Sequence, residues 1–248
     1  MVRMKLPRIF GNKDKIDSGG FSVIENENEK VLVYNGITYS KIKKNSVYTR
    51  EYWDFFLPVA YAFDKPKVLL IGVGGGTVAY QLVTLLKENT TIDAIDLSPR
   101  ALEIAKSFAL PASVNAMVGE GSEYVAKTSK RYDIIMVDAY IASSIPAQFT
   151  SAGFIGDAYK VLSDDGILAV NYAVGMMGIF RMRDFVARLK EHGFSVFSAS
   201  TAFFEGNVIL VCSKAPDSGK LLERIKQRMP ASDDNMFLLR SYESLKEL

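Results

Sequence analysis

Residues 68–80 read VLLIGVGGGTVAY. The apolar run VLLIGV lacks polar alternation, which is typical of a strand in a parallel sheet that is covered on both faces. The run contains Gly72 near its end and is followed by Gly74, Gly75 and Gly76, and residues 77–87 have helical spacing. Glycine has no Cβ, so such a loop can adopt positive φ and lie against a ligand at the helix N-terminus. The stretch predicts a strand, a ligand-binding loop and a helix.

The same rhythm continues along the chain. Strand-like runs such as TIDAIDL and YDIIMVDAY alternate with helix-like runs such as SPRALEIAKSFA, and FSVFSASTAFF and GNVILVCSK close the series as an expected antiparallel pair. Such alternation predicts a doubly wound, Rossmann-like α/β sheet. Residues 216–248 are expected to form a terminal helix and a polar tail.

The N-terminal part has a different pattern. FSVIENEN, EKVLVYNG and ITYSKIKK are short, rich in β-branched and aromatic residues, and separated by polar turns, with Asn35-Gly36 at a hairpin position. A small antiparallel β domain over residues 1–47 and an α/β domain over residues 48–248 are therefore expected. Apolar residues at helical spacing from Tyr48 to Phe63 predict a helix at the start of the second domain.

Acidic residues follow the predicted strands. Asp96 ends the second strand, followed by Leu97, and its carboxylate is placed to accept hydrogen bonds from both hydroxyls of a ribose. Glu120, between Gly119 and Gly121, can accept a hydrogen bond from an exocyclic amino group such as that of adenine. The glycine loop and these acids together predict a nucleoside site. A dinucleotide is less favoured, because the third glycine of the GxGxxG fingerprint would stand at Thr77.

Asp138 ends the strand YDIIMVD at the carboxyl edge where open α/β sheets bind ligands. A carboxylate there, with apolar strand behind it, is suited to act as general base for an amine nucleophile. Tyr140 shares this strand end and is expected to help orient a substrate.

Composition narrows the function classes. The net charge is +2, with 30 basic and 28 acidic side chains, so no nucleic-acid or membrane partner is indicated. One cysteine and one histidine disfavour a cysteine-based or histidine-based metal site, and no metal is expected. No apolar stretch has the length to cross a bilayer, and a cytoplasmic location is expected.

The order of VLLIGVGGGT, AIDLSP, VGEGSEYV, YDIIMVDAY and GNVILVCSK resembles the spermidine synthase (polyamine aminopropyltransferase) family over roughly residues 18–215. The resemblance implies a methyltransferase-type Rossmann domain that binds decarboxylated S-adenosylmethionine and transfers its aminopropyl group to a diamine, usually putrescine. It also implies a homodimer or homotetramer. Asp96 matches the family's ribose-binding acid, Glu120 its adenine acceptor and Asp138 its catalytic base.

Further matches to the family are looser or missing. Tyr48 and Glu51 lie near a family tyrosine–glutamine pair and are candidate substrate residues, as is Glu205. The family's acid in the glycine loop is replaced by Gly75, and the second acid of its DSSDP-like motif by Ile141. Both acids would pair with ammonium groups, so their loss makes putrescine a poor candidate acceptor.

Two other functions stay open. An S-adenosylmethionine-dependent methyltransferase would fit AIDLSPRALEIAK, although Leu70 stands where such enzymes commonly have an acid. A nucleoside-binding module without catalysis would fit the two missing acids. Of the three functions, the sequence favours an aminopropyltransferase-like transferase, and the methyltransferase and the binding module stay as alternatives.

Overall fold

The structure is a computed structural model that describes residues 12–14, 20–87, 89–141, 144–173, 178–199, 207–215, 217–243 and 246–248. The strands are β1 (Asn12–Asp14), β2 (Phe21–Glu25), β3 (Glu29–Tyr34), β4 (Ile37–Lys43), β5 (Lys67–Ile71), β6 (Thr91–Asp96), β7 (Asn115–Val118), β8 (Tyr132–Val137), β9 (Leu162–Ala173), β10 (Ser195–Ala199), β11 (Asn207–Ser213) and β12 (Lys246–Glu247). The helices are α1 (Leu57–Ala60), α2 (Thr77–Leu86), α3 (Pro99–Phe108), α4 (Gly121–Lys127), α5 (Ala152–Val161), α6 (Gly178–Glu191), α7 (Ser218–Arg228) and α8 (Asp233–Glu243), with short 3-10 helices η1 (Tyr52–Phe56) and η2 (Ala147–Thr150).

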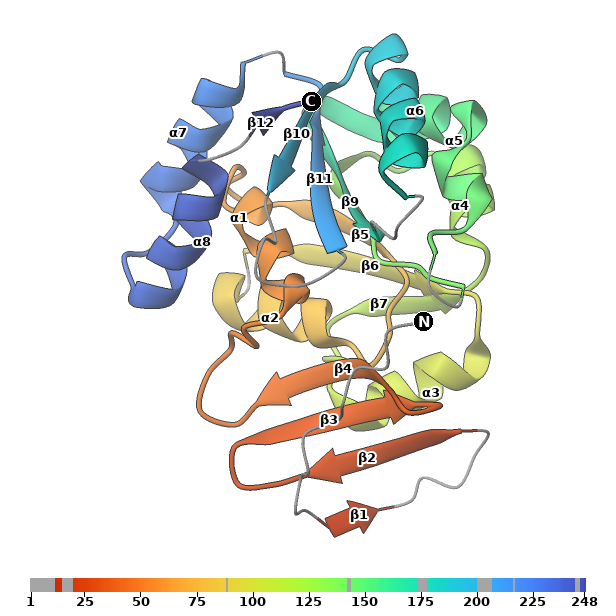
Figure 1. Cartoon of the computed structure of the whole chain (residues 1–248), viewed down its shortest axis with the longest axis vertical. Coiled ribbons are helices and arrows are strands. Elements are labelled where there is room, and N and C mark those ends of the chain that lie inside the picture. Colours follow the sequence, from red (N-terminus) through yellow and green to blue (C-terminus); the bar gives the residue numbers. More distant parts are fainter. Residues whose placement is uncertain are drawn as a thin grey trace.

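The main sheet has the strand order β12-β10-β11-β9-β8-β5-β6-β7 (Figure 1). Strands β9, β8, β5, β6 and β7 run parallel. Strand β11 pairs antiparallel with β9, and β10 pairs antiparallel with β11. The predicted doubly wound sheet and its antiparallel closing pair are confirmed. The chain moves outward from β5 to β7 and returns at β8 on the other side of β5, which creates a switch point at the carboxyl ends of these strands.

Helices cover both faces of this sheet, as Figure 1 shows. Helices α1, α2, α7 and α8 pack in one apolar cluster with strand residues such as Leu70. Helices α4, α5 and α6 pack on the other face with neighbours such as Leu69 and Ile71. Burial on both faces explains why the strand sequences are continuously apolar.

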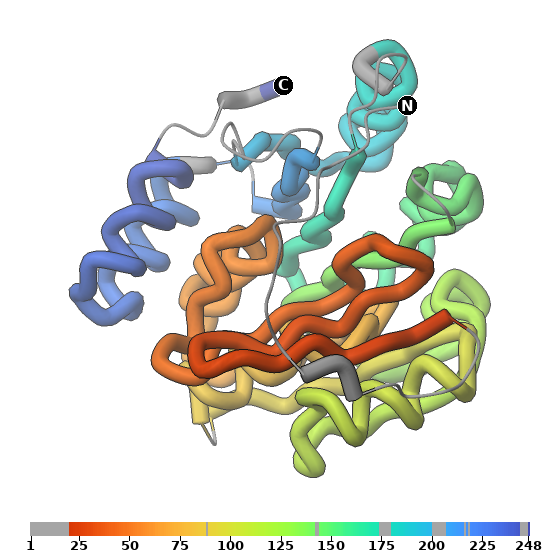
Figure 2. Tube along the Cα trace, turned by 60° about the horizontal axis from the view of Figure 1, so that its bottom comes forward, coloured from red at the N-terminus to blue at the C-terminus, as the bar shows by residue number. Residues whose placement is uncertain are grey.

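The small sheet has the order β1-β2-β3-β4 and confirms the predicted N-terminal antiparallel sheet. Asn35 and Gly36 have φ of 49° and 81°, which suits the two central positions of a tight hairpin turn. Helix α3 lies between the sheets: Leu102 and Ala105 face the main core, whereas Ile104 and Phe108 pack with Val23 and Leu32 (Figure 2). The small sheet is therefore fixed against the main sheet through α3. The domain division at residue 47 stays a prediction.

Two predicted elements differ from the structure. The expected helix from Tyr48 to Phe63 is reduced to η1 and α1, because Arg50 has a φ of 65° and Pro58 lacks the N–H needed to continue a helical ladder. The expected terminal helix is present as α7, but the expected polar tail contains a further helix, α8, which buries Leu238 and Tyr242 in the main core. The sequence did not predict the apolar face of α8, because charged and polar residues are mixed with its apolar ones.

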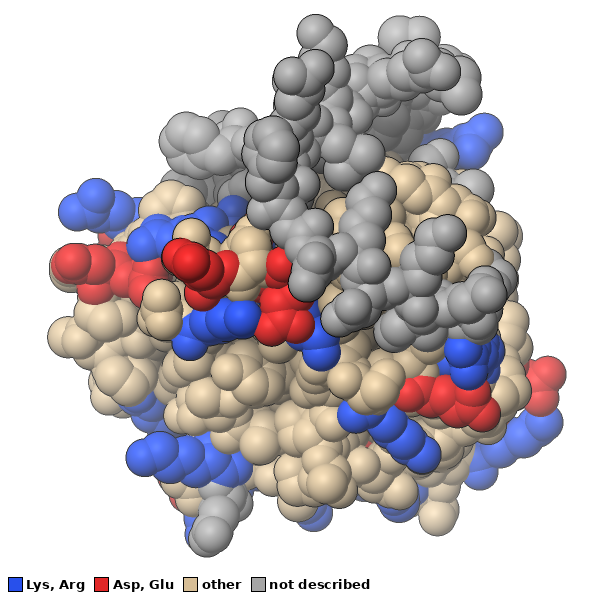
Figure 3. Space-filling view, turned by 90° about the horizontal axis from the view of Figure 1, so that it is seen from below, with Lys and Arg blue, Asp and Glu red and all other residues tan. Residues whose placement is uncertain are grey.

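Charged side chains are interspersed on the face shown in Figure 3, where basic and acidic groups alternate. Among the helices in the described part of the chain, none is long and apolar enough to cross a membrane.

Candidate active site

The glycine loop joins β5 to α2 and lies against the end of β8. Gly72, Gly74 and Gly76 have φ of 86°, 57° and 91°, which favours glycine. A Cβ at Gly72 would lie 2.4 Å from the carbonyl oxygen of Asp138. The glycines therefore bring the loop into direct contact with the strand end that carries the predicted base.

Asp96 lies beside this loop. Its Oδ2 accepts a hydrogen bond from the Val73 N–H at 2.9 Å, and its Oδ1 accepts one from the Ser98 N–H at 2.9 Å. Each carboxylate oxygen has two acceptor positions, so each retains capacity for a further donor such as a ribose hydroxyl. The structure thus brings together the loop and the acid that the sequence paired.

An apolar surface adjoins Asp96. Leu97 is 67% exposed and Val118 is 54% exposed, and Val118 is the direct pairing partner of Asp96 on the neighbouring strand. Gly119 donates its N–H to the Asp96 carbonyl at 2.9 Å, and a Cβ at Gly121 would meet Ile71 at 2.4 Å. Exposed aliphatic side chains next to a ribose-type acid offer a flat apolar contact for a base.

Glu120 has a structural role as the N-cap of α4. Its Oε2 accepts hydrogen bonds from the Glu123 N–H at 2.8 Å and from the Ser122 hydroxyl. Burial raises the pKa of Glu120, but these hydrogen bonds outweigh it and hold the pKa below its ordinary value. Its Oε1 accepts a single long hydrogen bond, from Gln148 Nε2 at 3.4 Å. This is therefore the oxygen that could accept a hydrogen bond from a ligand amino group.

Asp138 lies in a half-buried, largely uncharged environment. Its Oδ1 accepts a hydrogen bond from Asn171 Nδ2 at 2.8 Å, and its Oδ2 lies 3.5 Å from the Tyr52 hydroxyl. Burial raises the pKa of Asp138 to about 6, although hydrogen bonds from Asn171, Tyr52 and Trp53 oppose this rise. A carboxyl group with this pKa can exchange protons near neutral pH, as a general base must.

The Tyr140 hydroxyl is engaged in a hydrogen bond within the protein. Its hydroxyl donates to the Asn171 carbonyl at 2.9 Å, and burial together with the Asp138 charge raises its pKa well above the ordinary value. Tyr140 therefore stays protonated and helps to fix the strand that carries Asn171.

The sequence analysis missed three partners of Asp138. Tyr52 and Trp53 come from η1, and Asn171, 1% exposed, comes from β9 and accepts from Asn207 Nδ2 at 3.0 Å. A buried asparagine inside the apolar run ILAVNYAV was the available signal, because such a side chain requires a polar partner.

A β-bulge brings two more residues to the site. The pairing of β3 with β4 passes from Leu32–Ser40 to Val33–Thr38 and leaves Tyr39 as the extra residue. The Ser40 hydroxyl accepts from the Gly75 N–H at 2.6 Å, and the Tyr39 ring packs in the cluster with Phe108. Burial, and then the charges of Asp96 and Asp138, raise the pKa of Tyr39 to about 12. The bulge therefore turns Tyr39 and Ser40 toward the glycine loop and the two acids.

Ser40 explains why residue 75, where the family has an acid, is a glycine in this chain. The N–H of Gly75 is already bonded, and a Cβ at Gly75 would lie 2.6 Å from the Ser40 Cβ and 2.9 Å from Phe108. Gly75 is therefore a contact for the small sheet, and no larger side chain fits there without movement of Ser40.

The candidate substrate residues Tyr48 and Glu51 are engaged elsewhere. The Tyr48 hydroxyl bonds Asn235 on α8, and Glu51 Oε1 lies 2.6 Å from Lys41 Nζ. Tyr52, four positions after Tyr48, is the tyrosine of this segment that lies beside Asp138, and Arg50 between the two has a φ of 65°. Glu205 lies outside the described residues.

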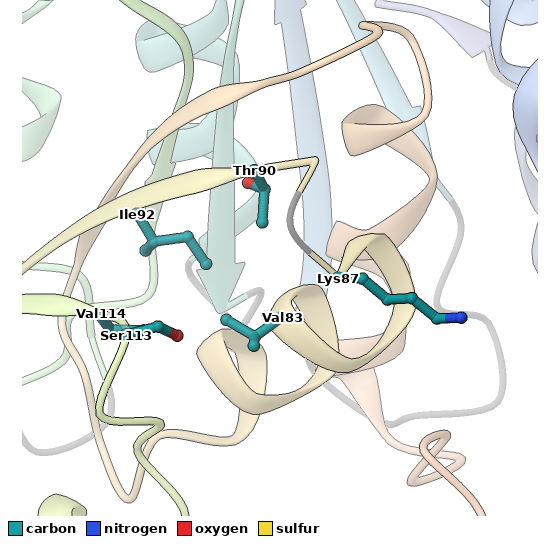
Figure 4. A pocket seen from close by; sticks show the side chains of 6 residues that line it. All are labelled: Val83, Lys87, Thr90, Ile92, Ser113 and Val114. Atoms are coloured by element: carbon teal, nitrogen blue, oxygen red, sulfur yellow. The ribbon is translucent and has the colours of Figure 1, made fainter.

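A separate hollow of about 310 Å³ lies at the opposite edge of the sheet (Figure 4). It is lined by Val83, Lys87, Thr90, Ile92, Ser113 and Val114. Thr90 and Val114 directly precede β6 and β7, whereas Asp96 and Val118 end them. The hollow is therefore remote from the acids. Among the described residues, no group of three or more His, Cys, Asp or Glu could hold a metal ion.

The strand order, with the glycine loop and the acids at the switch point, defines a Rossmann-like α/β fold that has its candidate ligand site at the carboxyl ends of the parallel strands. The chain superposes on a spermidine synthase in complex with the transition state analogue AdoDATO with a TM-score of 0.72 and 16% identity, covering 95% of this chain and 85% of that one. It superposes on human methyltransferase-like protein 13 in complex with SAH with a TM-score of 0.58 and 21% identity, covering 75% and 90%.

Residues 57–204, more than half of the chain, match the family described as spermine/spermidine synthase domain. The chain therefore belongs to the spermine/spermidine synthase family. It is 30% identical over 142 residues to the polyamine aminopropyltransferase of Methanocaldococcus jannaschii, covering 54% of this chain and 48% of that protein. The chain thus spans about half the length of this relative.

Proposed function

We propose that the protein transfers an aminopropyl group from decarboxylated S-adenosylmethionine to an amine acceptor. The observation that carries the proposal is the position of Asp138, a half-buried carboxylate whose strand end touches the glycine loop beside the ribose-type acid Asp96. Family membership supports the reaction class. A homodimer or homotetramer remains part of this proposal.

The residues fit such a co-substrate. Asp96 would bind the ribose hydroxyls, the Leu97–Val118 surface would contact the base, and Glu120 Oε1 would accept from its amino group. The sulfonium makes the adjacent carbon electrophilic; the protein provides alignment and a base.

The chemical step is a direct displacement. The lone pair of the acceptor nitrogen attacks the carbon bonded to sulfur, the C–N bond forms, and the C–S bond breaks with its electron pair going to sulfur. A neutral thioether leaves, and the proton lost from nitrogen goes to Asp138. Asn171, Tyr52 and Trp53 hold the carboxylate in place for this transfer.

A methyltransferase is the second candidate. It is supported by the fold shared with methyltransferase-like protein 13 and by the contact of Gly75 with Ser40, which leaves no acid in the glycine loop for the ammonium of a decarboxylated donor. A binding module without catalysis would also lack that acid.

Calorimetry with S-adenosylmethionine, its decarboxylated form and methylthioadenosine, followed by a product assay with amines, separates the three functions. Tighter binding of the decarboxylated donor and an aminopropylated product are expected. Preference for the carboxylated donor with a methylated product would establish the methyltransferase. Binding without turnover of either donor would establish the module.

A further inference from the structure

The acceptor side of the site is defined by the sheet. Asp138 follows β8, and the nucleoside residues follow β5, β6 and β7, which lie on one side of β8. The acceptor must therefore reach Asp138 from the other side, where β8 and its neighbour β9 end. The chemistry of these two strand ends determines which amine can bind.

The walls around Asp138 are aromatic or amide groups. Tyr52, Trp53 and Asn171 contact its carboxylate, and the Tyr140 ring lies two residues along. In the described part of the chain, no lysine or arginine forms an ion pair with Asp138. One carboxylate among aromatic rings is suited to one ammonium, which gains both a charge partner and cation–π attraction.

A second ammonium lacks a comparable partner among the described residues at this edge. Ile141, three residues after Asp138, is 64% exposed, and Phe180, near the start of α6, is 65% exposed. Arg181 and Arg183 follow Phe180, and their two positive charges exceed the single negative charge of the exposed Asp184 beside them. Asp96 and Glu120 lie on the nucleoside side and already accept backbone N–H groups. Exposed apolar side chains favour an apolar ligand body, whereas a second desolvated cation without a partner is costly.

From this arrangement we infer that the acceptor is an amine with a single ammonium group and an apolar or aromatic body. The inference rests on the proposed function and specifies its substrate class. The ammonium binds at Asp138 between the aromatic walls and gives one proton to the carboxylate, which frees the lone pair that attacks the donor carbon. The body of the amine lies over Ile141 and Phe180.

The test compares two amines at a fixed saturating concentration of the donor. The probes are phenethylamine, with one ammonium and an aromatic body, and putrescine, with two ammonium groups. Products are identified by mass spectrometry, and kcat/KM is measured for each. We expect phenethylamine to be preferred at least tenfold. Equal use of the two amines, or preference for putrescine, would overturn the inference and leave the proposed function intact.

A charge substitution at the edge supplies a second arm. Ile141→Asp adds the carboxylate that the described edge lacks and should shift the putrescine-to-phenethylamine ratio toward putrescine by at least tenfold. Ile141→Asn, similar in size and uncharged, is the matched control and should not produce this shift. An equal shift in both variants would show that the position does not act through charge and would contradict the inference.

Failure of the proposed function gives a different pattern. If neither amine is modified while methylthioadenosine binds the wild-type protein, the transferase assignment fails and the acceptor class falls with it. If putrescine is used well by the wild type and Glu205→Gln abolishes that use, a second acid completes the site and the single-ammonium class is wrong.

Discussion

The buried environment of Asp138 predicts that the activity depends on pH. Because burial raises its pKa to about 6, the carboxyl group is protonated below that pH and cannot accept the acceptor's proton. We expect kcat/KM to rise as pH increases through about 6. Asp138→Asn should lower turnover by roughly 10²–10⁴-fold, the usual contribution of a general base, while leaving methylthioadenosine binding within twofold. A steady-state pH profile and calorimetry check both parts, and near-normal turnover would place the base elsewhere.

The same shift has a consequence for stability. The folded pKa is raised above the ordinary 3.8, so the folded state binds more protons than the unfolded state between these values. Stability from this group is present below pH 3.8 and is lost as pH rises through about 6, by at most about 3 kcal/mol. Asp138→Asn removes the effect.

We therefore expect the Tm of Asp138→Asn to exceed that of the wild type at pH 8 and the difference to shrink toward pH 4. Thermal unfolding across this range measures it. A difference that is independent of pH would mean that the carboxyl group is not buried as described.

Asp96 provides the residue-scale test of the nucleoside site. Asp96→Asn keeps the shape of the side chain but replaces one acceptor oxygen by a donor group. It therefore disturbs the hydrogen bonds that Asp96 accepts from the Val73 and Ser98 N–H groups, and also its proposed hydrogen bonds to the ribose. We expect methylthioadenosine affinity to fall at least tenfold, which corresponds to about 1.4 kcal/mol. Asp164→Asn, on the exposed part of β9, is the control and should bind normally. Equal affinities for the two variants in calorimetry would remove Asp96 from the site.

At the scale of elements, α8 braces η1, the 3-10 helix that supplies Tyr52 and Trp53 to Asp138. The Tyr242 hydroxyl donates to the Phe55 carbonyl at 2.7 Å, and both residues are buried. Phe237 of α8 also packs edge-on against Phe55, with ring centroids 6.1 Å apart. The C-terminal helix, which lies outside the matched family region 57–204, therefore fixes part of the base's surroundings.

Removal of the hydrogen bond from the Tyr242 hydroxyl to the Phe55 carbonyl should measurably lower the stability of the fold. Tyr242→Phe is expected to lower the free energy of unfolding by about 1 kcal/mol, the usual net value of a hydrogen bond. Tyr61→Phe is the matched control, because the Tyr61 hydroxyl is buried without a hydrogen-bond partner in the described part of the chain. Denaturant unfolding of both variants checks this, and an equal loss would assign the effect to the hydroxyl's solvation instead of the bond.

The elements also explain how far the sequence could be interpreted. The parallel strands, the glycine loop and Asp96 were predictable because local patterns determine them: continuous apolar runs, glycines at a strand end, and an acid one strand later. The bulge at Tyr39 was not, because ITYSKIKK alternates like a regular strand and only the pairing with β3 reveals the extra residue. Tyr48 was the candidate substrate residue, but Tyr52 is the tyrosine that lies beside Asp138. The chain has a positive φ at Arg50 between them, a conformation that the neighbouring residues do not predict. The partners of Asp138 come from η1 and β9, which lie more than a hundred residues apart in the chain and meet at Asp138 only in the folded structure.

At the scale of the whole molecule, β4 of the small sheet and the glycine loop of the main domain form one contact surface. The Ser40 hydroxyl accepts from the Gly75 N–H, the Thr77 hydroxyl donates to the Lys41 carbonyl at 3.0 Å, and the Lys41 N–H donates to Thr77 Oγ at 3.2 Å. A ligand that orders the glycine loop should therefore order β4 as well, since local opening of one breaks bonds to the other.

Hydrogen exchange with and without methylthioadenosine tests this coupling. We expect bound nucleoside to slow exchange in residues 72–77 and also in residues 37–43, whereas β10, which lies beyond β8, β9 and β11 in the sheet, should be unaffected. Ser40→Ala removes the acceptor for Gly75, so protection should persist in the loop and weaken in β4. Protection of β4 that is the same in wild type and Ser40→Ala would mean that the ligand touches the strand itself, and protection confined to the loop in the wild type would show that the two sheets respond independently.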